Sequence, residues 1–393
     1  MKEIRKLGLF TFFRSLTFFA PISVMFYCEN GLSYFQIMIL QSIYGMMTAL
    51  FEIPSGALSD IIGRKKTLIF GTIMFAMAFA CGSVGQSMAP FVVMQVMAAA
   101  GQSCYSGTFV SLMYEDVIED KSIIKSVNHI FATMQSINIS GVLLSALLSS
   151  VVVKMAGMRY TYHLTLAAYI VTFVISLFLK DQRSGNDGKK SLGFSEYLFQ
   201  LKQNYKCITE NGIELIMMDL LLYAMFANTF SYIEQPILTG NGLNIELLGV
   251  VTVTMTVGVL IALKLFPYLE RGISTQKGIF AFTLSAIILT FSNFFINNIF
   301  FNVISFLLLT VVLRFREIIL TNEINKYINN DSRATFMSVV SALQMAGMAA
   351  LGLVAGKIAD VSISYTIVFL CSVMFGVYMI LTMVRRRKTL NNE

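Results

Sequence analysis

The fold is decided by one short charged stretch, Gly56-Ala57-Leu58-Ser59-Asp60-Ile61-Ile62-Gly63-Arg64-Lys65-Lys66-Thr67-Leu68. It lies between two apolar runs, 35–53 and 68–84, and runs of this size are long enough to cross a lipid bilayer as helices. A turn that carries Asp, Arg and two Lys side chains cannot lie in hydrocarbon, so we expect it at a membrane face. Its basic residues place that face in the cytoplasm.

The stretch also resembles the loop signature of the major facilitator superfamily, G-x-L-a-D-r-x-G-R-K-x-x-L. The matching positions are Gly56, Leu58, Asp60, Gly63, Arg64, Lys65 and Leu68, whereas Ile61 departs from the pattern. The preceding Phe51-Glu52-Ile53-Pro54-Ser55 resembles a bacterial, drug-exporter-like branch with a Phe-Glu-Ile-Pro-Thr-Gly motif. The resemblance implies the major facilitator fold, which is an all-α membrane protein with twelve transmembrane helices in two pseudo-symmetric six-helix bundles.

The composition agrees with a membrane protein. Of the 393 residues, 56% are hydrophobic and 13% are charged, and the mean hydropathy is +0.71, whereas about a quarter of the residues of a soluble domain are charged. The five cysteines are scattered through apolar runs without C-x-x-C spacing, so we expect no disulfide, no metal site and no cofactor. The net charge of +7 lies between the apolar runs and does not indicate nucleic acid binding.

Apolar runs predict twelve spans, arranged as an N-terminal bundle over 1–180, a cytoplasmic linker over 181–211 and a C-terminal bundle over 212–393. The expected spans are 7–28, 35–57, 66–86, 89–113, 128–153, 160–180, 212–236, 245–268, 276–296, 299–320, 334–357 and 362–384. Of the 29 Lys and Arg residues, Lys154, Arg159 and Lys357 fall on the outer side and Arg14 lies within the first span. This asymmetry predicts a multi-pass protein of the cell membrane with both termini in the cytoplasm, and we expect a monomer.

The resemblance implies a gating role for the charged stretch. Gly56 would let helices two and eleven approach closely, and Asp60 would face the positive N-terminus of helix eleven. Arg64 would bridge to Asp60 or to the acids after span four, as a latch that closes the cytoplasmic side. The alternative is that these charges only fix the topology. The gating candidates are Gly56, Asp60, Gly63, Arg64, Lys65, Glu115, Asp116 and Arg333.

Charged side chains inside spans are costly, and they usually mark functional sites. Arg14 in span one and Asp219 in span seven could pair, bind a charged substrate or carry a proton, and a structural ion pair is an equal alternative. Glu317 is expected to pair with a neighbouring arginine. Three basic residues are expected to extend to the cytoplasmic surface, namely Lys264, Arg314 and Arg316. The proton-coupling candidates are Glu29, Glu52, Asp219 and Glu234.

Polar side chains inside the apolar spans supply candidates for binding a substrate. Asn228, Tyr232 and Gln235 share one helix face, because they are spaced four and three residues apart. The many Phe (33) and Met (24) residues favour a large apolar cavity and therefore a lipophilic or amphiphilic cargo. The substrate-binding candidates are Arg14, Tyr27, Gln36, Gln135, Asn228, Tyr232 and Gln235.

These features favour a secondary active transporter that moves a small molecule by alternating access, as proton-coupled efflux. Its partners would be the substrate, protons or another coupling ion, and membrane lipid. Met97 stands where drug exporters of the superfamily carry Arg, so we expect other acids to carry the protons. An uptake permease is the alternative, and a non-transporting membrane receptor is a third hypothesis. No phosphate loop, zinc-ligand spacing or nucleophile elbow indicates an enzyme.

Overall fold

The computed structural model describes residues 2–119, 127–180, 214–270, 274–326 and 333–390, and every regular element in them is a helix. The chain divides into two compact units. Unit 1 comprises Met1–Leu32, Ile43–Phe194 and Ile245–Thr252, and unit 2 comprises Ser33–Ser42, Ser195–Asn244 and Val253–Glu393. The expected linker over 181–211 lies outside the described residues, so the domain limits at 180 and 211 remain predictions.

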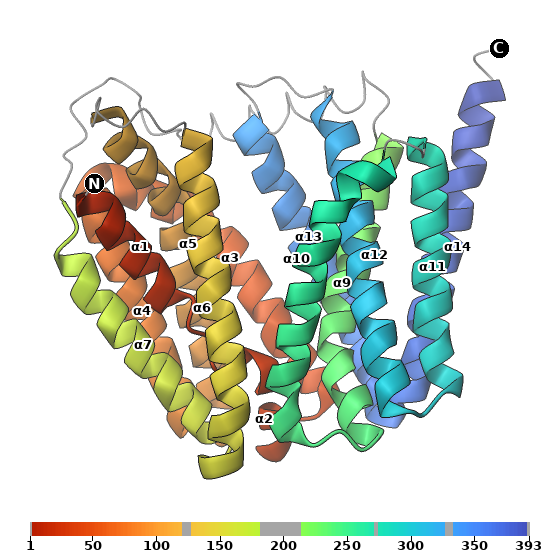
Figure 1. Ribbon diagram of the computed structural model, residues 1–393, viewed down its shortest axis with the longest axis horizontal. Helices are drawn as coiled ribbons and strands as arrows, with labels where there is room; N and C mark the ends of the chain where they lie inside the picture. The colour runs from red at the N-terminus through yellow and green to blue at the C-terminus, as the bar shows by residue number, and fades with distance from the viewer. Residues whose placement is uncertain (1, 120–126, 181–213, 271–273, 327–332, 391–393) are drawn as a thin grey trace. The chain divides into compact units, whose positions relative to one another are not determined.

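Within each described range the helices follow one another with short connections (Figure 1). Unit 1 holds α1 (Lys2–Arg14), η1 (Ala20–Ile22), α2 (Ser23–Glu29), most of α3 (Tyr34–Ile62), α4 (Arg64–Val84), α5 (Met88–Glu119), α6 (Val127–Ala156), α7 (Arg159–Leu177), η2 (Ile245–Leu247) and the start of α10. Unit 2 holds the start of α3, α9 (Glu214–Gly240), the rest of α10 (Leu248–Glu270), α11 (Thr275–Phe295), α12 (Ile299–Asn325), α13 (Arg333–Val361) and α14 (Ile363–Leu390).

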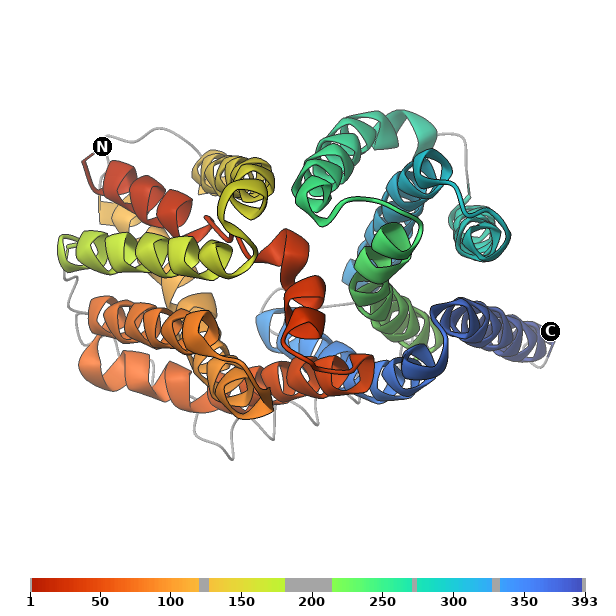
Figure 2. The same ribbon diagram turned by 90° about the horizontal axis from the view of Figure 1, so that it is seen from below.

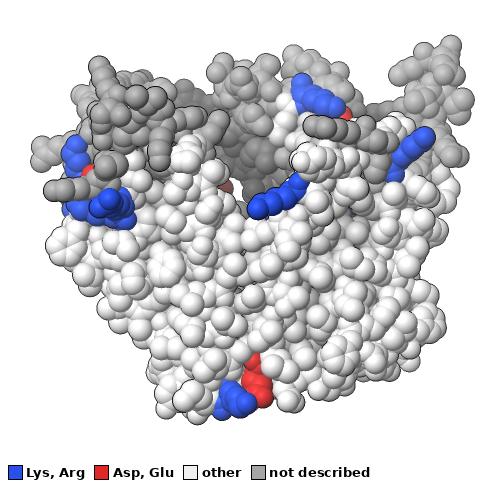
Figure 3. Space-filling view, viewed as in Figure 1, with Lys and Arg blue, Asp and Glu red and all other residues white. Residues whose placement is uncertain are grey.

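Eight of the described helices are long and apolar enough to cross a membrane, namely α3, α4, α6, α7, α9, α10, α11 and α14. Their outer faces suit lipid, since Leu144, Leu147 and Val151 of α6 are exposed. Figure 3 shows that most of the described surface on the visible face carries no charged side chains. The expected number of twelve spans therefore remains a prediction, of which eight have the required length and composition.

Unit 1 is built around α4, which packs against α5 and α7, while α1 packs against α6 and α7. Figures 1 and 2 both show α7 running beside α1. Gly71 of α4 makes the close approach to α5 possible, because a Cβ there would lie 3.1 Å from the carbonyl oxygen of Gly101. Small residues allow this kind of backbone contact between membrane helices.

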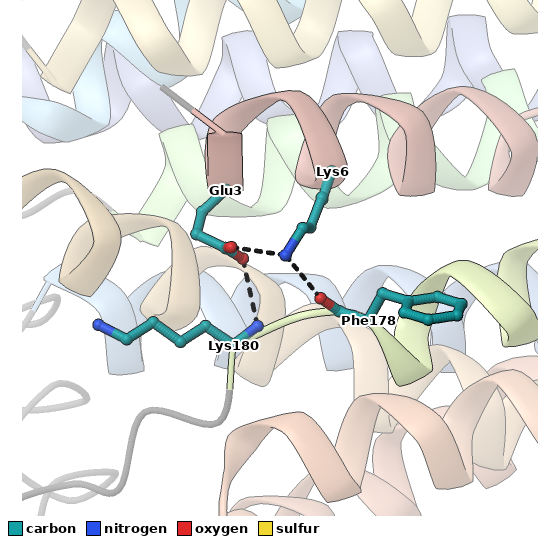
Figure 4. Close-up of polar contacts among 4 residues, drawn as sticks. All are labelled: Glu3, Lys6, Phe178 and Lys180. Atoms are coloured by element: carbon teal, nitrogen blue, oxygen red, sulfur yellow. Dashed lines mark hydrogen bonds and ion pairs between the residues drawn. The ribbon is translucent and has the colours of Figure 1, made fainter.

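The start of α1 is fixed to the end of α7 by polar contacts (Figure 4). The Lys6 ammonium donates to the Glu3 carboxylate at 2.6 Å and to the carbonyl oxygen of Phe178 at 2.9 Å, and the Lys180 backbone N–H donates to Glu3 at 3.2 Å. A cation at a helix C-terminus and an acid that accepts the following N–H both satisfy groups that the end of α7 leaves open.

In unit 2, α9 packs against α12, α13 and α14, and α11 packs against α12 and α14. A buried amide network connects these helices near the α11–α12 connection. Asn302 donates to Asn293 at 2.7 Å, Asn293 donates to Ser305 at 2.9 Å, and Asn241 donates to Asn302 at 3.2 Å. Each buried amide therefore has a partner, as a low-dielectric interior requires.

The first turn of α3 has all of its free N–H groups satisfied. Ser33 and Gln36 form a capping box, in which the Ser33 N–H donates to the Gln36 side chain at 3.0 Å and the Gln36 N–H donates to the Ser33 hydroxyl at 3.3 Å. The N–H groups of Tyr34 and Phe35 donate to the carboxylate of Asp360, near the end of α13, at 2.6 Å and 3.3 Å. Asp360 therefore supplies both the acceptor and the negative charge that a helix N-terminus favours.

A second helix start in the chain is capped in a similar way. The Val250 N–H, in the first turn of α10, donates to the Ser150 hydroxyl of α6 at 3.2 Å. A glycine permits the close approach at each place. A Cβ at Gly249 would lie 2.5 Å from the Ser150 hydroxyl oxygen, and a Cβ at Gly356 of α13 would lie 2.9 Å from the carbonyl oxygen of Tyr34.

The charged stretch is helical for most of its length, in contrast to the turn expected over 56–68. Helix α3 continues to Ile62 and α4 begins at Arg64, so Gly63 alone joins them. Gly63 has a φ of 91°, a conformation that only glycine adopts without strain. Its carbonyl oxygen accepts the backbone N–H and the hydroxyl of Thr67. The acid and the glycines of the stretch did not indicate this, because a charged helix end and a charged loop have the same composition.

The first expected span, 7–28, is not one helix. Helix α1 ends at Arg14, and η1 and α2 follow after a short irregular segment. The Ser15 hydroxyl donates to the carbonyl oxygen of Phe12 at 2.7 Å, and Pro21 lacks the N–H that a continuous helix would need. Gly141 of α6 packs against this break, because a Cβ there would lie 2.9 Å from the Phe12 carbonyl oxygen.

We expect Asp360→Ala to lower the free energy of unfolding by about 1–2 kcal/mol, because two N–H groups lose their acceptor and a helix end loses its countercharge. Asp360→Asn is the matched control, since it keeps an oxygen acceptor without the charge, and should lose roughly half as much. Thermal unfolding of the purified protein in a neutral detergent measures both. Equal stability of Asp360→Ala and the wild type would contradict the capping role.

Gly63→Ala and Gly56→Ala should change stability in opposite directions. The positive φ of Gly63 makes any Cβ unfavourable by about 1–2 kcal/mol. Gly56 is an exposed helical residue with no described atom within 4 Å of a Cβ, so alanine there should stabilise by about 0.5–1 kcal/mol. The same unfolding assay compares the two variants, and a loss of stability in Gly56→Ala as large as that in Gly63→Ala would show that φ does not decide the difference.

Candidate functional site

A buried ion pair lies inside unit 2. The Asp219 carboxylate of α9 accepts a hydrogen bond from the Arg316 guanidinium of α12, and these residues are only 2% and 4% exposed. The Nε of Arg316 donates to the Thr283 hydroxyl of α11 at 2.9 Å, and its guanidinium carbon lies 5.5 Å from the ring centre of Tyr223. One charged cluster thus connects three helices.

This arrangement corrects one expectation. Arg316 does not extend to the surface, because its charge is neutralised in the interior by Asp219. For Asp219, a structural ion pair was one of the open alternatives, and its partner within unit 2 is Arg316. The neighbouring Arg314 is exposed and pairs with Glu317 at 2.5 Å, which confirms the local pair expected for Glu317.

A small cavity of about 40 Å³ lies beside the ion pair. Asp219, Thr283 and Arg316 supply its polar lining, and residues such as Met374 and Val377 of α14 supply its apolar wall. A polar cavity of this size can hold a water molecule or a small ion. The buried carboxylate therefore has room beside it for a water molecule.

The energy of the pair depends on keeping both partners charged. Removing two charges from water costs several kcal/mol per ion, and only a close partner with additional hydrogen bonds repays this cost. Loss of one partner from a buried pair typically destabilises a protein by about 3–5 kcal/mol. A change in the charge of Asp219 would therefore change the packing energy of α9, α11 and α12 together.

Arg14 lies in unit 1 at the end of α1, in an aromatic environment. Its guanidinium carbon is 3.4 Å from the ring centre of Tyr105. Tyr44 lies close enough to interact with the charge, and the Tyr169 hydroxyl is within hydrogen-bonding reach. The Nε of Arg14 is buried and donates to no acceptor. None of the ion pairs among the described residues includes Arg14.

Two of the predicted substrate residues make contacts within the protein, and their role in substrate binding stays a prediction. Tyr27 is 1% exposed, and its ring packs against Phe91 at 5.0 Å between ring centres, so it belongs to the aromatic core of unit 1. Gln36 uses its side-chain carbonyl oxygen to close the cap of α3. The polar groups that suggested ligand contacts are thus satisfied within the protein.

The predicted polar face of α9 is present. Asn228, Tyr232 and Gln235 are half-buried on this helix, and the Tyr232 hydroxyl donates to the Gln41 side chain of α3 at 2.7 Å. Asn228 donates to the Ala224 carbonyl oxygen of its own helix. Gln135 is exposed on α6.

The remaining acids differ in exposure. Glu29 is the exposed last residue of α2, whereas Glu52 and Glu234 are half-buried within α3 and α9. Unlike Asp219, these three acids are in none of the ion pairs among the described residues.

The gating candidates lie at helix ends. Gly56 and Asp60 lie in the last turns of α3, Glu115 and Asp116 near the end of α5, and Arg333 at the first residue of α13. The side chains of Asp60, Glu115, Asp116 and Arg333 lie outside the described part of the chain, so their expected contacts remain predictions. Arg64 and Lys65 are half-buried in the first turn of α4. The close helix approach expected at Gly56 stays a prediction.

Sequence reasoning missed Thr283 and the tyrosines Tyr105 and Tyr169. Hydroxyl and phenol groups inside apolar runs are common, so their positions alone gave no signal. A helix-face projection of α12 would have shown that Arg316 lies on the same face as the buried Leu309, Leu313 and Leu320.

Comparison with known proteins gives one family match. The model of the Major Facilitator Superfamily matches residues 7–350. An uncharacterized transporter of Buchnera aphidicola subsp. Schizaphis graminum (strain Sg) is 32% identical over 99 residues, which are 25% of each chain. The uncharacterized MFS-type transporter YwoD of Bacillus subtilis (strain 168) is 25% identical over 163 residues, which are 40% of this chain and 34% of that protein. The matches thus span a quarter to a third of these curated relatives.

Solved structures share the fold over nearly the whole chain. The nucleoside transporter NupG has a TM-score of 0.79 at 10% identity, covering 98% of this chain and 99% of that one. An auto inhibited POT family peptide transporter has a TM-score of 0.73 at 13% identity, covering 98% and 97%. At these identities the likeness shows the fold alone. With the family matched over residues 7–350 and eight described helices able to cross a bilayer, the chain is an all-helical, multi-pass membrane protein that belongs to the Major Facilitator Superfamily.

Proposed function

We propose that this chain is a secondary active transporter that expels a small amphiphilic molecule from the cell in exchange for protons. The buried Asp219–Arg316 pair is the observation that carries the proposal, because an ionisable residue inside a membrane protein is costly and typically marks an ion pathway. Twelve spans in two bundles, both termini in the cytoplasm, and alternating access about a central site complete the proposed arrangement.

The coupling step follows from the electrostatics of the pair. When Asp219 takes up a proton, it loses its charge and no longer neutralises Arg316, which leaves an uncompensated cation in the interior. The helices that pack around the cluster then favour another arrangement, in which Arg316 finds water or another acceptor. Release of the proton restores the pair. Proton binding and helix packing are in this way linked through one contact.

The exposed apolar surface and the many Phe and Met residues support an amphiphilic cargo. Import of a small metabolite is the alternative, and the direction of proton flow distinguishes the two. The proposed cytoplasmic gate consists of the end of α3, the end of α5 and the start of α13. Gly63 forms the turn that joins α3 to α4.

We expect proteoliposomes with an acidic interior to accumulate dyes from a panel of fluorescent amphiphiles, because protons leaving the vesicle drive exchange. A symporter would instead accumulate dye when the outside is acidic. Vesicles that accumulate no dye under either gradient would refute proton coupling, and vesicles without the protein provide the control.

The double variant Asp219→Asn with Arg316→Gln should separate coupling from folding. Each single change leaves a buried partner uncompensated and should destabilise by about 3–5 kcal/mol, whereas the double change should recover much of this loss. The double variant should still equilibrate dye across vesicles but should not respond to a pH gradient. Accumulation equal to the wild type would exclude this pair from the coupling.

Asp60→Asn tests the gate. Loss of its charge should weaken a contact with a helix N-terminus, worth about 0.3–1 kcal/mol, and should abolish accumulation while membrane abundance stays normal. Lys66→Gln is the matched control, because it lies in the same stretch but outside the matching positions. Unchanged transport in Asp60→Asn would leave these charges with a topological role alone.

A further inference from the structure

We infer that Arg14 and its surrounding tyrosines form a subsite for a single acidic group, so that the molecule bound in unit 1 is an amphiphilic carboxylate. The inference deepens the proposed transport function, on which it rests for calling this ligand the cargo. Arg14 is an arginine in the described part of unit 1 whose charge is not neutralised by a carboxylate there, since none of the ion pairs among the described residues includes it.

Two other arginines, Arg316 and Arg159, have acceptors within the protein, as is typical of a structural role. Arg316 has a carboxylate and a hydroxyl as acceptors. Arg159 donates to the carbonyl oxygens of Ser83 and Gly85, each at 2.9 Å, and to the Asn30 side chain at 2.8 Å. Arg14 differs from both, because its Nε is buried without an acceptor. A buried donor without a partner is unfavourable unless a ligand supplies one.

The stacking geometry leaves the Nε of Arg14 without an acceptor, while the guanidinium also lies within hydrogen-bonding reach of the Tyr169 hydroxyl. A guanidinium that lies over an aromatic ring uses its face for the cation–π contact, while its N–H groups point outward in its plane. The Tyr105 ring is itself held by Phe109, with ring centres 4.8 Å apart. The Arg14 guanidinium is therefore held in place before any ligand binds. Its planar set of N–H donors suits a bidentate contact with a carboxylate.

The subsite is also accessible. Arg14, Tyr44 and Tyr105 are each partly exposed, whereas Tyr169 is buried behind them. The phenol groups of Tyr44 and Tyr169 can donate to the same anion. The Tyr105 ring stacks on the buried core rings Phe10 and Phe109, so the ring beneath Arg14 is rigidly supported.

The break after α1 explains how the charge is tolerated before a ligand arrives. Arg14 is in the last turn of α1, where the free carbonyl groups carry partial negative charge. This interaction lowers the cost of the cation without occupying its in-plane donors. Irregular backbone within membrane spans typically lines a cavity or a binding site.

Binding of 2-naphthoate, compared with its neutral amide 2-naphthamide, tests the inference in a neutral maltoside detergent. The two probes have the same shape and differ in charge. The chain contains no Trp, so naphthyl fluorescence is measured against a low protein background. We expect the wild type to bind naphthoate at least about tenfold more tightly than naphthamide. Equal affinity for the two probes would overturn the inference.

Variants then assign the preference to Arg14. Arg14→Gln should remove it, and Arg14→Lys should retain only part of it because lysine lacks the planar guanidinium. Arg314→Gln, which changes an exposed arginine of unit 2, should keep it in full. If Arg14→Gln does not fold, the comparison of Arg14→Lys with the wild type decides, and a full preference in Arg14→Lys would refute the role of the planar guanidinium.

A lipid phosphate has similar chemistry, so added phosphatidylglycerol provides a second arm. Loss of naphthoate binding at low phosphatidylglycerol would reassign the subsite to a lipid headgroup and overturn the inference. Transport is scored separately. Selective binding of naphthoate without accumulation in vesicles would refute the transport function and leave the subsite standing, whereas dye accumulation without any preference for the acid would refute only the subsite.

Discussion

A lipid bilayer provides no hydrogen bonds, and this constraint governs how the described helices begin, end and break. The backbone groups inside a helix satisfy one another, but the first N–H groups and the last carbonyl groups do not. At the start of α3, Gln36 and Asp360 accept the free N–H groups, and at the start of α10 Ser150 does so. At the end of α7 the Lys6 ammonium donates to a free carbonyl oxygen. Contacts far apart in sequence thus follow from a local requirement.

The same low dielectric separates the two interior arginines into different roles. Arg316 is buried, its charge is neutralised by Asp219, and it donates a hydrogen bond to Thr283. A change in the charge of Asp219 therefore affects the three helices that carry these residues. Arg14 is stacked on Tyr105 and partly exposed, so its charge remains open to a ligand. In the proposed transport cycle the first arginine responds to protons and the second to cargo. The two tasks are placed in different units, which keeps a proton from competing with the ligand for one residue.

Hydropathy was sufficient to predict the helical class and most spans, because a long apolar run has few other stable conformations in a membrane. It failed at 15–22, where the break is as apolar as its flanks and only Ser15 and Pro21 marked it. Some side chains expected to bind a substrate have a local partner within the protein. Gln36 follows Ser33 at capping-box spacing, a pattern that explains the residue without a ligand. Arg316 was misplaced because its acceptor lies 97 positions away in the chain.

The Asp360 carboxylate has a consequence for biosynthesis. It is separated from Tyr34 by 326 positions, so the ribosome completes its partner on α3 long before the acid exists. At ordinary rates of translation this interval is on the order of tens of seconds. During that time the Ser33–Gln36 box, which is encoded within four residues, caps the nascent helix without Asp360. The start of α3 is thus stabilised first by a local cap and later by an acid on α13.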